Sequence, residues 1–269
     1  MKLATWNVNS LKVRLPQLLD WVGVNPVDVI GLQETKLTDE AFPAAELEAA
    51  GWHWAHCGQK TYNGVAILAR TPLRDVVYGI PGFDDEQKRV IAATVDSAHG
   101  PLRYICVYVV NGQAVGSDKY AYKLRFLEAL RAYVADEVGK HPNLAIGGDY
   151  NIAPFPEDTH DPATWEGNIL CSEPERDGFR ALLALGLKDA FTLFEQPPHS
   201  FTWWDYRAAG FRRNQGLRID HLLLSTPLAA ACTAASADLL PRRNERPSDH
   251  APFIATIGEN RQGNGLSKP

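Results

Sequence analysis

The sequence predicts an α/β (α+β) fold in which packed β-sheets are covered by helices. Short apolar runs rich in β-branched residues recur along the chain, for example at residues 27–32 and 253–257. Several of these runs follow one another without an intervening helix, which favours antiparallel pairing and sheet-on-sheet packing. Helical spacing of apolar residues is confined to a few segments, the longest at residues 120–138.

The size and composition of the chain are those of one globular domain. It has 269 residues, of which 45% are hydrophobic and 22% charged, and no linker-like stretch divides it. We therefore expect one catalytic-sized domain at residues 1–258 and a disordered tail at the polar, glycine-rich residues 259–269. The net charge of −5 does not by itself indicate a nucleic-acid binder, although a basic rim can surround an acidic site.

The cysteine pattern and the N-terminus bear on the compartment. Cys57, Cys106, Cys171 and Cys232 are scattered without a C-x-x-C spacing, so they do not indicate a zinc site and fit free thiols in a reducing compartment. The chain begins with strand-like residues and shows no signal peptide and no apolar run long enough to span a membrane. These features predict a cytoplasmic protein with no membrane partner, and we expect a monomer.

Periodicity places the individual elements in order along the chain. Leucine spacing predicts a helix from Leu11 to Val22, with Pro16 expected in its first turn, and Ser172 is a candidate N-cap of a helix that ends at Gly186. Residues 158–170 are rich in loop-forming residues. Strands are predicted at residues 2–8, 27–32, 62–68 (after a turn), 89–95, 103–110, 143–146, 217–224 and 253–257, and further helices at residues 42–51 and 120–138.

Polar side chains stand at the ends of several apolar strands. Asp149 and Asn151 follow the buried run at residues 143–146, and alternate residues of an extended segment point to the same side. A carboxylate and an amide placed together can take a proton from a water molecule and hold that water. The same residues also fit a simple Asx turn, in which they serve only the backbone. Asn7 and Glu34 end two other strands, where Glu34 is either a site residue or a solvated loop residue.

Seven stretches together resemble the exonuclease III family of apurinic/apyrimidinic (AP) endonucleases, within the deoxyribonuclease I-like endonuclease/exonuclease/phosphatase superfamily. They occur in the order of that family and span residues 6 to 252, so the agreement is far stronger than any one motif. The stretches are Trp6-Asn7-Val8-Asn9, Leu32-Gln33-Glu34-Thr35-Lys36, Tyr62-Asn63-Gly64-Val65-Ala66, Tyr108 with Asn111-Gly112, Gly148-Asp149-Tyr150-Asn151-Ile152-Ala153-Pro154, Gly216-Leu217-Arg218-Ile219-Asp220 and Pro247-Ser248-Asp249-His250-Ala251-Pro252.

The resemblance implies a four-layer sandwich of two mixed sheets flanked by helices, with the site at the sheet edges. It also implies a DNA repair nuclease that cuts duplex DNA on the 5′ side of abasic sites and removes 3′-blocking groups or 3′ nucleotides. By the same resemblance, Tyr108, Asp149, Asn151, Asp220 and His250 are catalytic, and Glu34, Asn7, Asp249, Asp149 and Asn151 lie at the metal. Oxygen ligands without clustered Cys or His favour Mg²⁺ or Mn²⁺ as the cofactor.

A second group of residues is expected to bind the substrate. Trp203 and Leu217 match the sugar pocket of the family, although aromatic residues of this segment also suit a core, above all Trp204. Leu170 stands where the family usually has a small residue, which favours 3′-end processing over incision at internal abasic sites unless Leu170 points into the core. Several arginines could contact DNA phosphates or could simply lie on an exposed, solvated face: Arg207, Arg212, Arg213, Arg218, Arg242, Arg243 and Arg246. Asp189 is expected to be structural.

Two other functions remain open from the sequence. A phosphoesterase of the same superfamily acting on inositol phosphates or sphingolipids would share the metal residues but not the stretch Arg218-Ile219-Asp220 with its small-sugar pocket. A catalytically silent module that binds DNA ends would need few of the polar site residues that this chain retains.

Overall fold

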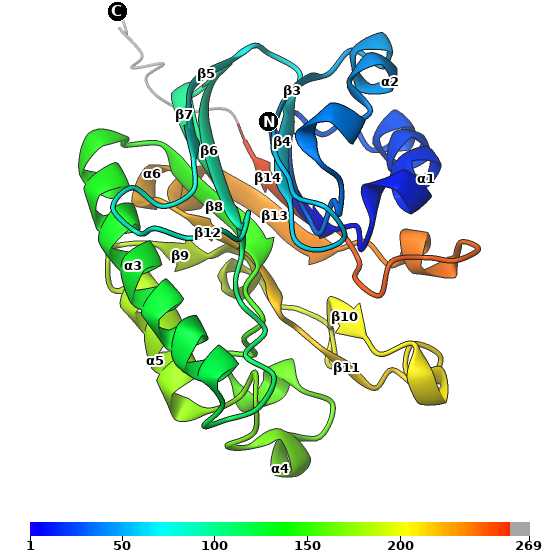
Figure 1. The fold of residues 1–269 in the computed structure, drawn as a ribbon, viewed down its shortest axis with the longest axis vertical. Helices are drawn as coiled ribbons and strands as arrows, with labels where there is room; N and C mark the ends of the chain where they lie inside the picture. Colours follow the sequence, from blue (N-terminus) through cyan, green and yellow to red (C-terminus); the bar gives the residue numbers. More distant parts are fainter. Residues whose placement is uncertain (259–269) are drawn as a thin grey trace, which may run out of the picture.

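Two six-stranded mixed sheets pack face to face in the computed structural model, which describes residues 1–258 (Figure 1). The predicted tail at residues 259–269 lies outside the described residues. The first sheet has the strand order β13 (Cys232–Ala237), β14 (Phe253–Ile257), β1 (Lys2–Asn7), β2 (Val29–Gln33), β4 (Val65–Ala69) and β3 (His53–Cys57). The second has the order β5 (Leu73–Tyr78), β6 (Val90–Ser97), β7 (Gly100–Tyr108), β8 (Leu144–Asp149), β12 (Asp220–Leu224) and β9 (Lys188–Asp189).

Helices cover the outer face of each sheet, which gives the four layers expected from the sequence (Figure 1). The helices α1 (Leu11–Val24) and α2 (Ala44–Ala49) pack on the first sheet through residues such as Trp21 and Leu47. The helices α3 (Asp118–Lys140) and α5 (Glu173–Leu183) pack on the second through Phe126 and Phe179. The remaining elements are α4 (Pro162–Trp165), α6 (Thr226–Ala231), the hairpin strands β10 (Trp203–Trp204) and β11 (Gly216–Leu217), and the 3₁₀ turns η1 (Asp39–Ala41), η2 (Pro156–Asp158), η3 (Ala190–Leu193), η4 (Arg207–Ala209) and η5 (Leu240–Arg243).

The main core lies between the two sheets. Leu3 and Ile67 of the first sheet meet Ile91 and Leu222 of the second, and all four are fully buried. Burial of this apolar area is the principal favourable term in the free energy of folding. The hydroxyl of Tyr104 crosses between the sheets and donates to the Ala4 carbonyl at 2.6 Å, so a buried polar group is satisfied at the centre of the sandwich.

The two glycines that precede Asp149 are required by this close packing. A Cβ at position 147 would meet the Tyr104 hydroxyl at 2.1 Å, and one at position 148 would meet the Val107 carbonyl at 2.0 Å. Both separations are shorter than any real contact, so β8 approaches its neighbours more closely than a side chain allows. The Gly-Gly pair therefore fixes how deeply Asp149 sits at the end of the strand.

The structure corrects several details of the sequence interpretation. Pro16 is the sixth residue of α1 rather than a first-turn residue. The run predicted as one strand at residues 217–224 divides between β11 and β12, which belong to different sheets. Strands β3, β5 and β13 were not predicted. The edge positions of β5 and β13 leave half of their residues exposed, so the apolar signal is weak there, whereas β3 is mostly buried but carries two histidines among its five residues. Within residues 1–258, no helix combines the length and apolarity needed to cross a lipid bilayer.

Candidate active site

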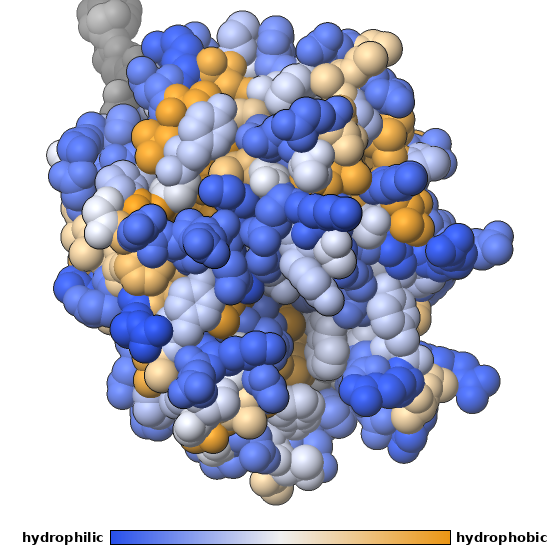
Figure 2. Space-filling view, viewed as in Figure 1, coloured by the Kyte–Doolittle hydropathy of each residue, from blue (hydrophilic) through white to orange (hydrophobic). Residues whose placement is uncertain are grey.

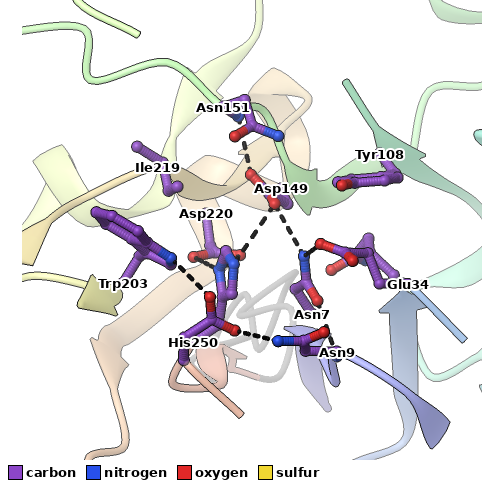
Figure 3. Close-up of polar contacts among 12 residues, drawn as sticks. Asn7, Asn9, Glu34, Tyr108, Asp149, Asn151, Trp203, Ile219, Asp220 and His250 are labelled. Carbon is purple, nitrogen blue, oxygen red and sulfur yellow. Dashed lines mark hydrogen bonds and ion pairs between the residues drawn. The ribbon is translucent and has the colours of Figure 1, made fainter. Parts of the chain in front are cut away.

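The predicted polar residues converge where strand ends of the two sheets meet (Figure 3). Asn7 ends β1 and Glu34 follows β2, and these two strands run parallel in the first sheet. From the second sheet, Asp149 ends β8 and lies opposite Asp220 in the register of β12. Tyr108 ends the neighbouring strand β7 and is aligned with Asp149. Residues far apart in the chain therefore meet because four strands end at one place.

Asn7 joins the two sheets through its side-chain amide. Its Nδ2 donates to Glu34 Oε1 at 2.9 Å and to Asp149 Oδ2 at 2.9 Å. One amide thus holds two carboxylates together, and each keeps a second oxygen for other partners. Lys36 lies 3.0 Å from the other oxygen of Glu34 and offsets part of the negative charge.

The donor set fits a divalent cation. Glu34, Asp149 and His250 each offer a ligand atom, and these atoms lie within 4.8 Å of one another. The two carboxylates are the hard oxygen donors of this group, while Asn7 joins them through Nδ2 and accepts the N–H of Asn9 with its Oδ1 at 2.9 Å. Hard oxygen donors of this kind suit Mg²⁺ and Mn²⁺ rather than zinc.

His250 forms a buried pair with Asp220. Its Nδ1 lies 2.9 Å from Asp220 Oδ2, and its Nε2 lies 3.7 Å from Asp149 Oδ2, so the ring spans two carboxylates. Burial acts to lower the pKa of His250, but the charges of Asp220 and Asp149 outweigh it and raise that pKa to about 10. His250 is therefore an imidazolium at neutral pH that presents Nε2–H to the site.

Burial raises the pKa of Asp149 to about 7, since the lowering by His250 and by the Asn7 hydrogen bond does not offset desolvation. A divalent cation beside it would lower that pKa and keep the carboxylate ionised. The backbone N–H of Asn151 donates to Asp149 Oδ1 at 2.9 Å. The Asx turn considered from the sequence is thus present, and it also orients the carboxylate in the site.

The hydrogen bonds of Asn151 and Asp249 connect these two residues to the surroundings of the site. The Asn151 amide donates to the Val109 carbonyl and accepts from Asn111, so it supports Asp149 from behind. Asp249 accepts hydrogen bonds from Asn9 at 2.9 Å and from the Trp203 indole at 3.0 Å, and it is not part of the group around Glu34. Asp249 therefore connects the polar site to the aromatic wall rather than to the two carboxylates.

Tyr108 lies beside Glu34 and Asp149 at the rim of the site (Figure 3). Burial and these two carboxylates raise its pKa well above the usual value for tyrosine, so the phenol keeps its proton. The guanidinium of Arg89 stacks on the ring at 4.7 Å from the centroid. Tyr108 is thereby held as a neutral hydrogen-bond donor.

The three apolar residues predicted to bind substrate belong to one apolar cluster, called the wall below, in which Leu170 and Leu217 are buried, as the core alternative expected, and Trp203 is partly exposed. Trp203 pairs with Leu217 in the β10–β11 hairpin, and Leu170 packs in the same cluster with Leu217 and Ile219. The backbones of Trp203 and His250 form an isolated antiparallel β-bridge, which places the wall beside the polar residues of the site. On the face seen in Figure 2, a hollow has apolar atoms on its floor and hydrophilic side chains on its rim.

The expectation that Arg218 contacts DNA is wrong. Its side chain is 1% exposed, and its guanidinium donates to Asp158 at 2.6 Å and to Asp189 at 2.6 Å. The positive charge of Arg218 is therefore compensated inside the protein by these two carboxylates. Pairing with Arg218 is the structural role of Asp189. Arg242 is likewise buried and donates to the Ser248 carbonyl. The arginines that remain exposed are Arg207, Arg212, Arg213, Arg243 and Arg246.

Backbone strain marks the same site. Glu34 has φ 53° and Asn151 φ 50°, and Asn9 and Lys36 also lie in the left-handed region, at φ 43° and 55°. Such conformations are unfavourable outside glycine and persist where the surroundings impose them, often at functional sites. The roles of Asn9 and Lys36 were missed from the sequence, although both lie within matched motifs. A positive φ on a polar residue after a strand is the structural signal that identifies them.

Carboxylates and a carboxylate-paired imidazolium, gathered at the edge of an α/β sandwich, define a hydrolytic enzyme. The chain belongs to the endonuclease/exonuclease/phosphatase family, which it matches over residues 4–250. The family is metal-dependent, and this membership confirms the resemblance inferred from the seven motifs.

Three relatives show how far the similarity extends. Exodeoxyribonuclease III of Haemophilus influenzae is 37% identical, over 95% of this chain and 99% of its own length. The structure of a 3′ phosphatase, NExo, from Neisseria, bound to a product DNA hairpin, is 49% identical with a TM-score of 0.92, over 96% of this chain and 99% of that one. An AP endonuclease from Archaeoglobus fulgidus is 35% identical with a TM-score of 0.90, over 96% and 99%.

Proposed function

We propose that the protein is a Mg²⁺- or Mn²⁺-dependent DNA repair nuclease that hydrolyses phosphodiesters on the 5′ side of abasic sites and removes 3′-blocking groups or 3′ nucleotides from duplex DNA. The observation that carries this proposal is the joining of Glu34 and Asp149 by Asn7, directly beside the His250–Asp220 pair. The similarity to exodeoxyribonuclease III and to DNA-bound NExo supports DNA as the substrate.

A bound Mg²⁺ would supply positive charge to the phosphate oxygens and to the leaving oxygen. Glu34 and Asp149 would hold it, with Asn7 beside both carboxylates. Asp149 accepts a proton from the attacking water, and its Asx turn keeps the carboxylate aimed at that water. The Nε2–H of His250 donates to a phosphate oxygen and offsets the charge that develops there, while Asp220 fixes the ring. The neutral phenol of Tyr108 donates to the same phosphate.

The apolar wall formed by Trp203, Leu217 and Leu170 fits a small deoxyribose without a base. The partly exposed indole of Trp203, backed by the buried leucines, would accept such a sugar and disfavour a normal nucleotide by size. A phosphoinositide or sphingolipid headgroup would present more hydroxyl or charged groups to this wall than it can satisfy. The wall therefore favours DNA over the other substrates of the superfamily.

A second candidate function is preferential processing of 3′ ends, with weak incision at internal abasic sites. Leu170 has φ 70°, a conformation suited to glycine, and its side chain adds bulk to the wall next to Leu217. An internal abasic site needs room for DNA on both sides of the flipped sugar, whereas a 3′ end does not. The similarity to a 3′ phosphatase favours this specialised form.

One experiment tests both functions. An abasic duplex and a 3′-phosphate duplex are incubated with the protein in Mg²⁺, in EDTA, and in EDTA followed by excess Mg²⁺ or Mn²⁺. We expect cleavage only with the metal and faster release of the 3′ phosphate than abasic incision. Activity in EDTA would disprove the metal-dependent mechanism, and activity on a phosphoinositide but on neither duplex would identify the other branch of the superfamily. Binding of both duplexes without turnover would identify a silent module.

A further inference from the structure

A fully buried ion pair lies beneath the active site and takes no part in the chemistry described above. Lys123 of α3 and Glu175 of α5 are both 0% exposed and bonded to each other. Burying two charges is unfavourable, and apolar residues of similar volume often stabilise a fold at least as well. The partners of each charge indicate why a Lys–Glu pair occupies this place.

The ammonium group of Lys123 supports the catalytic turn, residues 149–151. Its Nζ donates to the Asn151 carbonyl at 2.6 Å and to the Asn111 carbonyl at 3.2 Å, in addition to Glu175. The side chain of Asn111 in turn donates to Asn151, whose N–H holds Asp149. Lysine has three donors, and all three are used here. The ammonium thus fixes the backbone that aims the Asp149 carboxylate.

The carboxylate of Glu175 supports the loop on the other side. Its Oε1 accepts the N–H of Leu170 at 3.1 Å, and its Oε2 accepts the N–H of Ser172 at 3.1 Å. Leu170 has φ 70°, a left-handed conformation that is unfavourable for a leucine. The bond from Glu175 holds this strained residue in the apolar wall. One ion pair is therefore bonded directly to the catalytic turn and to the wall.

We propose that Lys123 and Glu175 are a positioning pair that sets the catalytic turn at a fixed distance from the Leu170 wall, and so controls both turnover and the choice between 3′ ends and internal abasic sites. This inference rests on the proposed function for its kinetic readout. Removal of the ammonium leaves the Asn151 and Asn111 carbonyls without their buried donor, so the catalytic turn shifts. Removal of the Glu175 carboxylate takes away the hydrogen-bond acceptor of the Leu170 N–H, so Leu170 is no longer held in its strained conformation.

The test separates positioning from stability with a double variant. Lys123→Met and Glu175→Gln each leave an unpaired polar or charged group, and each should lower the Tm by about 10 °C. The double variant Lys123→Met/Glu175→Gln buries no charge, and its amide oxygen can still accept from the N–H of Leu170 or of Ser172, though not from both. The matched control is Arg103→Met/Glu137→Gln, because this pair is also buried, at 3% and 6% exposed, joins β7 to α3 and contacts no site residue. Each protein is assayed at least 15 °C below its own Tm.

We expect the Lys123/Glu175 double variant to recover most of the Tm while kcat for the 3′-phosphate duplex falls about 10- to 100-fold with little change in KM, since small displacements of reacting groups reduce rates on this scale. The ratio of abasic to 3′-phosphate turnover should also change. The control should keep both the wild-type kcat and the wild-type ratio. Wild-type kcat and ratio in the Lys123/Glu175 double variant would overturn the inference, whatever its Tm.

A measurement independent of activity uses amide hydrogen exchange. In the double variant, the peptides covering residues 149–153 and 168–172 should exchange faster than in wild type, and in the control they should not. Unchanged exchange in both peptides would also overturn the inference. If the wild type cleaves neither duplex, the proposed function fails, and the exchange data still decide whether the pair positions the two segments.

Discussion

The two sheets contribute to the site in different ways. The first sheet supplies Asn7 and Glu34, and the side chain of Glu34 is 18% exposed, has left-handed backbone and is paired with Lys36. The second supplies Asp149 and Asp220, which are 1% and 0% exposed and lie on paired strands. The accessible side suits a group that exchanges metal with solvent. The buried side suits groups whose pKa values and orientations must be controlled.

This comparison predicts the largest effects on the buried side. Asp149→Asn and His250→Ala should each reduce kcat by about 10³- to 10⁴-fold, because a proton acceptor and a charge-stabilising donor act mainly in the transition state. DNA binding, measured by anisotropy, should change little, and added Mg²⁺ should not restore turnover. Asp220→Asn is the internal control and should be less harmful than His250→Ala, since it only disturbs the orientation and charge of the ring. Near-normal turnover of the Asp149 or His250 variant would disprove the assignment.

The accessible side should behave differently. Glu34→Ala should weaken the apparent Mg²⁺ affinity by about 100-fold, because a ligand is lost while Asp149 and Asn7 remain. Turnover at low Mg²⁺ should therefore fall strongly and recover in part at high Mg²⁺. A titration of kcat against Mg²⁺ measures this, with Asp149→Asn as the variant that does not recover. If Glu34→Ala and Asp149→Asn showed the same dependence of kcat on Mg²⁺, the proposed difference between the accessible and the buried side of the site would be wrong.

A third prediction concerns Leu170 and the choice between the two DNA substrates. Leu170→Gly should raise abasic incision about 10-fold relative to 3′-phosphate release, since hydrophobic walls discriminate on this scale. Loss of the buried side chain costs about 2–5 kcal/mol, offset by relief of about 1–2 kcal/mol of backbone strain. The Tm should therefore fall by only about 5 °C. Leu170→Ala removes bulk but keeps the strain, so it should raise incision with a larger fall in Tm. If both activities fall together with the Tm, Leu170 serves only the core.

The smallest expected effect concerns His56, which supports the first sheet. His56 lies 2.9 Å from Thr35, the residue after Glu34, and 2.9 Å from Asp39. Burial lowers its pKa to about 4, against the opposing charge of Asp39. Since the folded pKa lies below the unfolded value of about 6.5, the stability is fully present above pH 6.5 and is lost as the pH falls towards 4, by up to about 3 kcal/mol.

Thermal unfolding between pH 7 and pH 5 measures this effect. His56→Gln keeps a partner for Thr35 but does not titrate, so its Tm should fall less than that of the wild type over this interval. Parallel curves for the two proteins would contradict the assigned shift. His250, in the segment that precedes β14, adds no such acid sensitivity, because its pKa of about 10 lies above this pH interval.

The sequence by itself determined most of the central strands and helices and the polar residues at their ends, and its resemblance to a known family supplied the four layers. Strand and helix periodicity depends on local alternation between core and solvent, which is why β1, β2, β8 and α3 were predicted close to their bounds. Polar residues at strand ends identified Asn7, Glu34 and Asp149 for the same reason. Ser172 was found as a helix cap because capping requires only local chemistry, and it forms a capping box with Glu175.

Only the tertiary structure decided which charges face the substrate. Arg218 has the composition of a phosphate-binding residue, yet its partners Asp158 and Asp189 are 60 and 29 residues away in the chain and bury it. Lys123 and Glu175 are separated by 52 residues, and although Glu175 belongs to the local capping box, nothing local indicated its pairing with Lys123. The free energy of a charge depends on its burial and its partners, and both are set by contacts between segments that are distant in the sequence.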